Sequence, residues 1–258
     1  MKKTSALLLA AGLGTRLRPY TEHWPKCLMP IKGRPLLEYW FSLLKEVKIN
    51  NVLVNTHYHA DLVLDFLKRP SLSSSVKSVF EKDLLGTAGT LRANTAYFNG
   101  STVLLVHADN LCCCDFSSFL NFHHNERPAD TVMTMMTFKT PRPSTCGIVE
   151  IDRNGIVMDF YEKVQSPPSD LANAAVYLIE PEVIDWINNN PEVSDFSTEV
   201  LPNFIGRIAT WNNGNVLRDI GTISMLRDAQ SDNCIPPDWS EDNWNKEFLT
   251  NPIHKQIL

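Results

Sequence analysis

The opening residues constrain the fold more than any other part of this chain. Residues 6–11 form an apolar run, which predicts a buried strand. The run ends at Gly12 and Gly14, where the backbone has to turn. Prolines recur through the turns that follow, as Pro19, Pro25 and Pro30. Because a proline inside a helix costs about 3 kcal/mol, we expect the strand to open into a long irregular loop, and such loops are usually functional.

This loop carries cations and a hydroxyl beside its glycines, namely Thr15, Arg16, Arg18 and Lys26. Glycines allow backbone N–H groups to approach a phosphate, and cations neutralise its charge. The dinucleotide-binding fingerprint does not fit, because Leu17 stands at the third glycine position and no helix is expected after the turn. A P-loop does not fit either, because the loop lacks a Gly-Lys-Ser/Thr ending. The stretch therefore predicts a phosphate-binding loop of another kind.

Residues 10–30 resemble the signature of the sugar-1-phosphate nucleotidylyltransferases, also called nucleotide-sugar pyrophosphorylases. That signature runs Gly-x-Gly-Thr-Arg-Leu-x-Pro-x-Thr and then, after a short spacer, Pro-Lys-x-Leu-x-Pro. The positions that fit it are Gly12, Gly14, Thr15, Arg16, Leu17, Pro19, Thr21, Pro25, Lys26, Leu28 and Pro30. The resemblance implies that Arg16 and Lys26 are catalytic. It also implies a nucleotide-binding segment made of Ala10, Ala11, Gly12, Gly14, Thr15 and Arg16.

Beyond the loop, the pattern predicts an α/β fold. Helical spacing of apolar residues alternates with short apolar runs, the helices being expected at 36–47, 59–67, 87–97 and 116–123 and the strands at 52–55, 76–80 and 102–106. Such alternation implies a Rossmann-like, mostly parallel sheet flanked by helices. After residue 130 the chain is rich in strand-forming residues, which predicts an antiparallel portion, and the resemblance makes this the sugar-binding portion.

Turn and cap signals give finer expectations for this second half. Residues 152–155, Asp-Arg-Asn-Gly, are a hairpin turn signal. We expect a second hairpin from residues 206–211 and 215–217. We expect Ser197 to cap a helix that runs to Phe204.

The domain organisation follows from the same pass along the chain. We expect one catalytic domain over residues 1–230, because no low-complexity linker interrupts it. Residues 231–258 carry Trp239 and Trp244 in a polar setting. We expect this C-terminal segment to pack on the body or on a partner subunit, which leaves a homo-oligomer open. The β-helix domain of hexapeptide repeats that many relatives carry is not expected, because the chain shows no such period.

Two aspartates predict a metal site. Asp109 lies just past the apolar run 102–106, and ligands of parallel α/β sheets bind at the carboxyl ends of strands. Asp219 precedes the small-residue turn Ile-Gly-Thr. Mg²⁺ takes one or two carboxylates and leaves coordination sites for phosphate oxygens. The resemblance implies that Asp109 and Asp219 are catalytic and share Mg²⁺, although Ala108 stands where the family has glycine.

Residues 81–91 predict the nucleobase site. Backbone groups can approach a base closely at Gly86 and Gly89, which open the expected helix. The resemblance implies base contacts from Leu85, Gly86, Thr87, Ala88 and Gly89. The Leu-Gly-Thr-Ala-Gly sequence is closest to mannose-1-phosphate guanylyltransferases, and the glutamine usual in glucose-1-phosphate thymidylyltransferases is absent from this region. These features favour guanine.

The sugar-phosphate site is predicted from the second half of the chain. Residues 146–163 resemble the family's Gly-x-Val…Gly-x-Val…Phe-x-Glu-Lys segment. The resemblance implies that Glu162 accepts hydrogen bonds from sugar hydroxyls and that Lys163 pairs with the sugar phosphate. Asn173 is a further sugar candidate, in an Asn-x-Gly-x-Tyr pattern in which Ala175 replaces the glycine.

Composition excludes other classes. The net charge of −5 and the pI near 5.8 argue against nucleic acid or an anionic membrane as a partner. The first apolar run is shorter than the ~7–15 residues of a secretion signal, so we expect a cytoplasmic protein. Six cysteines, of which Cys112, Cys113 and Cys114 are consecutive, include no Cys-x-x-Cys pair. We therefore expect reduced thiols and neither a disulfide framework nor a zinc site.

The sequence thus predicts an enzyme that transfers a nucleotidyl group from a nucleoside triphosphate to a sugar 1-phosphate and releases pyrophosphate. GTP and mannose 1-phosphate are favoured. A heptose-1-phosphate guanylyltransferase, or a uridylyl-, cytidylyl- or thymidylyltransferase acting on another sugar, stays open. A non-catalytic regulatory subunit that binds nucleotide sugars is the alternative from another functional class. The presence of the charged residues Arg16, Lys26, Asp109 and Asp219 argues against it.

Overall fold

The computed structural model describes residues 3–98, 100–238 and 241–257, so Trp239 lies outside the described residues. Contacts divide the chain into two compact units, each built from three separate stretches. Unit 1 comprises Met1–Leu7, Leu85–Val106 and Asp115–Gly214. Unit 2 comprises Leu8–Leu84, His107–Cys114 and Asn215–Leu258. Strand β1 (Thr4–Leu9) contributes residues to both units.

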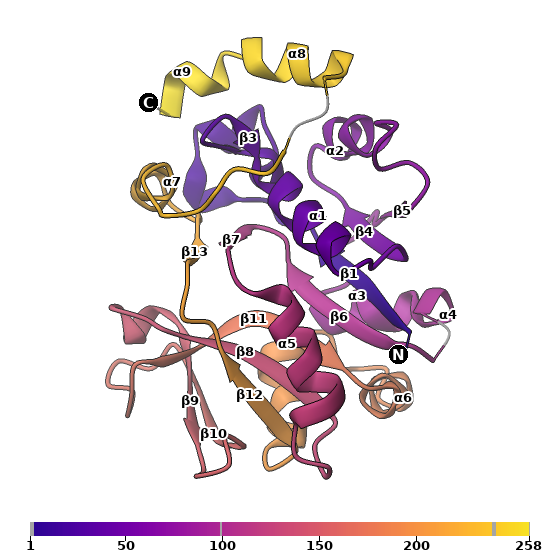
Figure 1. Ribbon diagram of the computed structural model, residues 1–258, viewed down its shortest axis with the longest axis vertical. Coiled ribbons are helices and arrows are strands. Elements are labelled where there is room, and N and C mark those ends of the chain that lie inside the picture. The colour runs from indigo at the N-terminus through magenta and orange to yellow at the C-terminus, as the bar shows by residue number, and fades with distance from the viewer. Residues whose placement is uncertain (1–2, 99, 239–240, 258) are drawn as a thin grey trace. The chain divides into compact units, whose positions relative to one another are not determined.

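Unit 1 is built on a mostly antiparallel set of strands. Its strands besides β1 are β6 (Thr102–His107), β8 (Met133–Lys139), β9 (Gly147–Ile151), β10 (Val157–Glu162), β11 (Leu171–Ile179) and β12 (Ile208–Asn212). The central strand β11 pairs antiparallel with β6, β8 and β9, while β12 runs parallel to β8 (Figure 1). The helices are α3 (Thr87–Ala93), α4 (Thr95–Phe98), α5 (Phe116–Asn121) and α6 (Pro181–Asn189). Most apolar residues of β11 and the residues Val183, Ile184 and Ile187 of α6 are buried and belong to the core of this unit.

Unit 2 contains the first helices of the chain and its C-terminal segment. Its parallel pair is β4 (Val52–Thr56) and β5 (Val76–Phe80), and its short antiparallel pairs are β2 (Pro30–Ile31) with β3 (Arg34–Pro35) and β7 (Asn110–Cys112) with β13 (Leu217–Asp219). The helices are α1 (Leu36–Glu46), α2 (Ala60–Leu67), α7 (Ile223–Ala229), α8 (Asn243–Thr250) and α9 (Ile253–Ile257). The strand order β1-β4-β5, with these helices beside it, is the Rossmann-like part of the fold.

The predicted α/β class is confirmed, and so is the irregular loop after the first strand. Residues 15–28 form three short 3₁₀ turns, Thr15–Leu17, Tyr20–Glu22 and Lys26–Leu28, in place of a helix. The hairpin expected from residues 206–211 and 215–217 is wrong, because β12 pairs with β8 and β13 pairs with β7. The cap expected at Ser197 is also wrong. Asp195 performs it, since its side chain accepts a hydrogen bond from the N–H of Thr198.

One apolar cluster of unit 2 underlies the loop. It includes Leu17 and Tyr20 from the loop, Ile220 beside Asp219, and Ile253 and Ile257 from α9. The hydroxyl of Tyr20 also donates to the carbonyl oxygen of Gln256 at 2.7 Å. Burying apolar surface here stabilises the loop by about 25 cal/mol per Å² removed from water. The C-terminal helix is therefore part of the support of the loop.

The cysteines differ from the expectation of reduced thiols. Cys113 and Cys234 form a disulfide within unit 2, with their Cα atoms 6.0 Å apart. The sequence pattern missed this pair because the two residues are separated by 121 positions and meet only through the fold. Among the described residues, Cys27, Cys112, Cys114 and Cys146 lie outside this disulfide.

Among the described residues, no helix is both long enough and apolar enough to cross a bilayer.

Candidate active site

The predicted loop is held in shape by contacts around Gly14. This residue has φ of 62°, a left-handed conformation that glycine adopts without strain. A Cβ atom here would lie 2.8 Å from Cγ2 of Thr21, so a larger residue would also clash. The hydroxyl of Thr21 donates to the carbonyl oxygen of Gly14 at 2.9 Å and closes the turn. Gly12, by contrast, has open space where a side chain would be, so its surroundings leave room for a ligand.

The structure brings Lys26, Asp109 and Asp219 together in unit 2. The Lys26 ammonium donates to Oδ2 of Asp109 at 2.7 Å and to Oδ1 of Asp219 at 2.8 Å. The lysine side chain is only 7% exposed, whereas the two carboxylates are 37% and 39% exposed. One cation therefore lies within hydrogen-bond distance of two partly accessible carboxylates that come from distant parts of the sequence.

A two-stranded ribbon explains why these aspartates meet. Strands β7 and β13 pair antiparallel with Asp219 opposite Asn110, so Asp219 lies across from the residue that follows Asp109. The carbonyl oxygen of Asn110 accepts a hydrogen bond from the Trp40 indole at 2.9 Å, which fixes this end of β7 on α1. Sequence reasoning missed the ribbon because each strand has three residues, too few for a periodic pattern.

Arg16 completes the cluster from the loop side. Its Nη2 lies 3.2 Å from Oδ2 of Asp219, and its side chain is 67% exposed. Gly221 makes room for this contact, because a Cβ atom there would lie 2.7 Å from both Arg16 Nη2 and Asp219 Oδ2. Sequence reasoning did not single out Gly221, although its place in the small-residue turn after Asp219 was the available signal. The exposed guanidinium can bind an anion that approaches from solvent.

The charges of the cluster shift the acidity of its members. Burial disfavours the charged ammonium, but Asp109 and Asp219 outweigh it and raise the pKa of Lys26. Partial burial opposes ionisation of Asp109, but Lys26 and His107 outweigh it and lower the pKa of that carboxyl. Burial and the nearby Asp109 raise the pKa of the Cys27 thiol to about 12, so this cysteine stays protonated and is unsuited to act as a nucleophile.

The beginning of the predicted nucleotide segment is anchored by residues that sequence reasoning missed. The N–H of Ala10 donates to Oδ1 of Asn55 at 2.7 Å, and the Asn55 amide donates to Glu81 at 3.0 Å. Ala10 and Ala11 are buried, while Thr15 is exposed. The N–H of Ala108 donates to the carbonyl oxygen of Leu9, which brings the residue before Asp109 to the end of β1. These contacts fix where the loop begins.

In unit 1, the segment expected to contact the base has a defined internal anchor. The N–H groups of Ala88 and Gly89 both donate to the carbonyl oxygen of Ser194, at 2.8 and 3.3 Å. Gly86 has φ of 77°, and a Cβ atom there would lie 2.5 Å from the same oxygen. The hydroxyl of Thr87 accepts a hydrogen bond from the N–H of Phe196. Leu85 is exposed. Any base contact from this segment would therefore use groups other than the N–H of Ala88 and Gly89.

The predicted sugar-site residues of unit 1 lie at the end of β10, directly after it, and on β11. Glu162 and Lys163 form an ion pair at 2.7 Å, with the lysine 65% exposed. The Asn173 amide donates to the hydroxyl of Tyr177 at 2.6 Å and its oxygen accepts the N–H of Ala175 at 2.9 Å. Asn173 thus holds the bulge at Ala175, whose φ is 55°. Burial raises the pKa of Tyr177, the hydrogen bond with Asn173 opposes this shift, and the nearby Glu162 charge adds to it.

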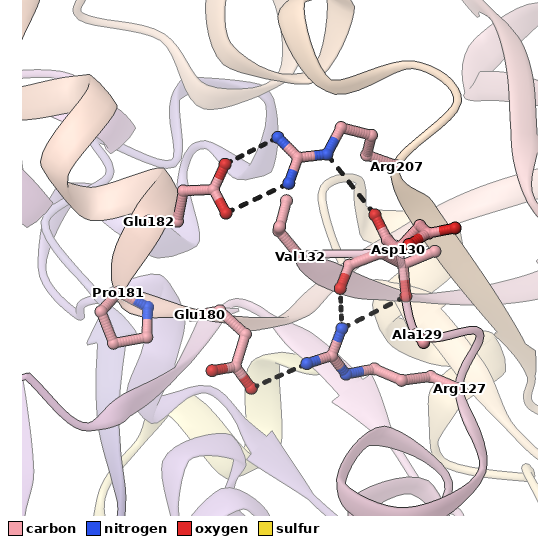
Figure 2. Close-up of a pocket in the computed structure, with 9 residues that line it drawn as sticks. Arg127, Ala129, Asp130, Val132, Glu180, Pro181, Glu182 and Arg207 are labelled. Carbon is pink, nitrogen blue, oxygen red and sulfur yellow. Dashed lines mark hydrogen bonds and ion pairs between the residues drawn. The ribbon is translucent and has the colours of Figure 1, made fainter.

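A cavity of about 550 Å³ in unit 1 has a different character (Figure 2). Arg207 makes a bidentate ion pair with Glu182 at 2.7 and 3.1 Å, and Arg127 pairs with Glu180 at 3.1 Å. Arg127 also donates to the backbone carbonyl oxygens of His123 and Thr131. These arginines already have carboxylate and backbone partners, and no predicted site residue lines this cavity.

Comparison with known proteins supports the same family. The chain matches the family described as nucleotidyl transferase over residues 5–234. A mannose-1-phosphate guanylyltransferase of Mycobacterium tuberculosis is 32% identical over 85% of this chain and 62% of its own length. The catalytic subunit beta of a Drosophila melanogaster mannose-1-phosphate guanylyltransferase is 32% identical over 77% of this chain and 54% of its own length. A UTP–glucose-1-phosphate uridylyltransferase of Synechocystis is 29% identical over 78% of this chain and 55% of its own length.

The fold has a solved counterpart as well. A crystal structure assigned to a glucose-1-phosphate thymidylyltransferase of Bacillus anthracis superposes with a TM-score of 0.79 at 20% identity, covering 94% of this chain and 99% of that chain. The chain spans between 54% and 62% of the length of the Drosophila and Mycobacterium relatives. It belongs to the nucleotidyl transferase family, within the sugar-1-phosphate nucleotidylyltransferases. The family predicted from residues 10–30 is therefore confirmed.

Proposed function

We propose that the protein transfers a nucleotidyl group from a nucleoside triphosphate to a sugar 1-phosphate and releases pyrophosphate. One observation carries the proposal: Lys26 lies 2.7 and 2.8 Å from Asp109 and Asp219, beside the exposed Arg16. This reaction requires cations for a triphosphate and carboxylates for a metal ion, and the cluster holds both. Membership of the family, shown by residues 5–234, points to the same chemistry.

In the proposed reaction, a phosphate oxygen of the sugar 1-phosphate attacks the α-phosphorus in line. The new P–O bond forms as the bond to the β-phosphate oxygen breaks, and pyrophosphate leaves with that electron pair. No covalent enzyme intermediate is needed, so the protein contributes position and charge. Arg16 would bind the β- and γ-phosphates with its guanidinium fork, a geometry that lysine cannot reproduce. Lys26 would stabilise negative charge at the α-phosphate.

The carboxylate pair fits Mg²⁺, which we propose as the cofactor. Asp109 and Asp219 would hold the ion, because both carboxylates reach one cation position and both are partly accessible. Bound Mg²⁺ supplies charge neutralisation across the phosphates of the nucleotide. Within the part of the chain that the structure describes, no group of three His, Cys, Asp or Glu residues is arranged to hold a metal. Two carboxylates with phosphate oxygens are the usual environment of Mg²⁺, whereas zinc needs more protein ligands.

For the substrates we propose GTP and mannose 1-phosphate. The Leu-Gly-Thr-Ala-Gly sequence at 85–89 and the names of the Mycobacterium and Drosophila relatives support this choice. A heptose 1-phosphate with GTP, or another sugar with UTP, CTP or dTTP, is the alternative. The similarity to the uridylyltransferase of Synechocystis is consistent with the use of UTP. Glu162 would accept hydrogen bonds from sugar hydroxyls, and Lys163 would pair with the sugar phosphate. Asn173 would act mainly by shaping β11, because its amide is hydrogen-bonded to Tyr177.

A matrix of triphosphates against sugar 1-phosphates, read by pyrophosphate release, tests the proposal. We expect the highest kcat/KM for GTP with mannose 1-phosphate. A higher kcat/KM for another pair would contradict the proposed substrates but would support the proposed reaction. Absence of pyrophosphate release with every pair, while nucleotide sugars still bind, would favour the non-catalytic regulatory subunit.

A further inference from the structure

The Lys26 ammonium contacts the same carboxylate oxygens that would coordinate a metal ion. Its ammonium contacts Oδ2 of Asp109 and Oδ1 of Asp219, and Arg16 contacts the remaining oxygen, Oδ2, of Asp219. Both oxygens of Asp219 therefore already face a cation of the protein. We propose that Lys26 is a built-in stand-in for the divalent ion and has to leave the two carboxylates before that ion binds. The inference rests on the proposed metal site.

The distances make joint occupancy unfavourable. The ammonium nitrogen lies 2.7 and 2.8 Å from the two oxygens. A magnesium ion would sit about 2.0–2.1 Å from the same oxygens. The ammonium and a doubly charged ion would then be only a few ångströms apart, at a place where Lys26 is 7% exposed and solvent screens little. The lysine and the metal ion thus compete for one position.

The surroundings of Lys26 determine how its ammonium group can move. Lys26 begins the 3₁₀ turn Lys26–Leu28, which follows Pro25, so its backbone is set by the loop and by buried Cys27 and Leu28. Its side chain must therefore swing while its backbone stays in place. An α-phosphate oxygen of a bound triphosphate offers an anionic partner in exchange for the carboxylates. We infer that the nucleotide and the metal ion enter together and that the free protein binds divalent ions weakly.

Lysine in this position also has a consequence for the free protein. Without the ammonium, the carboxylates of Asp109 and Asp219 would lie close together without a shared cation, and like charges repel. Lys26 therefore keeps the ribbon of β7 and β13 ready for the ion. A variant without the charge should gain affinity for a metal ion and lose stability when metal ions are removed.

Calorimetric titration of the nucleotide-free protein with Mn²⁺ alone tests the competition. Lys26→Met removes the charge and keeps the length of the side chain, and we expect it to bind Mn²⁺ about tenfold more tightly than the wild type, or better. Lys26→Arg keeps the charge and should stay as weak as the wild type. Lys246→Ala, an exposed lysine on α8, is the matched control and should not change affinity. Adding Asp109→Asn to Lys26→Met should remove the gain.

Thermal unfolding in EDTA and in Mn²⁺ gives a second readout. Lys26→Met should unfold at a lower temperature than the wild type in EDTA and should recover more of its stability with Mn²⁺. A larger gain in unfolding temperature on adding Mn²⁺ for the variant than for the wild type supports the proposal, and an equal or smaller gain overturns it. Equal or weaker Mn²⁺ affinity of Lys26→Met also overturns it. Catalysis is not involved in either measurement, so a wild type that releases no pyrophosphate would refute the proposed function while leaving this inference to be decided by Mn²⁺ binding.

Discussion

Two ionic clusters of this protein use the same kinds of residue in different ways. In unit 2, one lysine is shared by Asp109 and Asp219, and both of these partners of its ammonium are side chains. In the unit 1 cavity, Arg127 and Arg207 each have a glutamate of their own and also donate to backbone carbonyl oxygens (Figure 2). Backbone acceptors cannot move without moving the chain, so the arginines of unit 1 are fixed. The lysine of unit 2 can exchange its partners for those of a ligand.

The difference suggests how to separate a structural ion pair from one that we propose for catalysis. A guanidinium whose donors point at the backbone contributes to the shape of the fold. An ammonium that is hydrogen-bonded to two carboxylates can be displaced by another cation. Each carboxylate can then bind that cation in place of the ammonium. Exposure also distinguishes the two clusters. Arg16, at the edge of the unit 2 cluster, is 67% exposed and contacts the carboxylate of Asp219, so its guanidinium can also reach a ligand.

The largest effect is expected from Lys26→Ala. If Lys26 stabilises charge at the α-phosphate, its loss should lower kcat by about 10²–10³-fold, the usual effect of removing one electrostatic contact to a transition state. Steady-state pyrophosphate release measures this. Far-ultraviolet circular dichroism in the presence of Mg²⁺ checks that the fold survives. Near-normal turnover of folded Lys26→Ala would remove Lys26 from the mechanism.

The next largest effect is expected for the stability of unit 1 at acidic pH and depends on His123. Burial first, and then the charges of Arg127 and His124, lower the pKa of His123 to about 3, against the opposing pull of Glu180. His123 also contacts the hydroxyl of Thr134 and the carboxylate of Glu180, at 2.8 and 3.1 Å. Between about pH 6.5 and pH 3 the unfolded chain binds a proton here and the folded chain does not. The free energy of unfolding should therefore fall with decreasing pH, by up to about 1.4 kcal/mol per unit from this residue.

Urea unfolding of the wild type and of His123→Gln between pH 7 and pH 4.5 measures this. The variant keeps a group that can hydrogen-bond Thr134 but cannot titrate, so its stability should depend less on pH. Parallel curves for the two proteins would contradict the prediction. Such a result would mean that unit 1 tolerates a charged His123 and that its ionic cluster is less fixed than we argue.

A smaller effect is expected from Arg16→Lys. The substitution keeps the charge but loses the planar fork, so we expect a decrease of about tenfold in kcat/KM, or about 1.4 kcal/mol. The same change at Arg207, Arg207→Lys, serves as the matched control and should leave kcat/KM unaltered. An Arg16→Lys enzyme with wild-type kcat/KM would show that only charge matters at this position.

The smallest effect is expected for the exposed pair of the cavity. Arg207 and Glu182 are 44% and 56% exposed, so solvent screens their attraction. A double-mutant cycle with Arg207→Ala and Glu182→Ala, read by urea unfolding, should give a coupling of about 0.2–1 kcal/mol. Turnover should not change in any of the three variants. A coupling well above this range, or a loss of turnover, would mean that the cavity serves more than the local fold.

The sequence was sufficient for the parts of the site that lie within one continuous motif. Gly14 and the loop prolines predicted the irregular loop, and the structure has three 3₁₀ turns there. What the sequence could not supply were contacts between distant segments. The pairing of β7 with β13 joins residues 110–112 to residues 217–219, and nothing local distinguishes this pairing from the wrong hairpin with residues 206–211. Asn55 was missed for the same reason, because it reaches Ala10 across 45 positions.

The division of each unit into three stretches has a consequence for synthesis on the ribosome. Asp219 belongs to the last stretch of unit 2, Asn215–Leu258, whereas Lys26 belongs to the first. A nascent chain that has emerged only through residue 214 can complete unit 1 but offers Lys26 a single carboxylate, that of Asp109. Neither unit corresponds to one continuous gene fragment, so truncation cannot isolate either of them. The site that we propose for nucleotidyl transfer can thus be completed only after the chain beyond residue 214 has emerged.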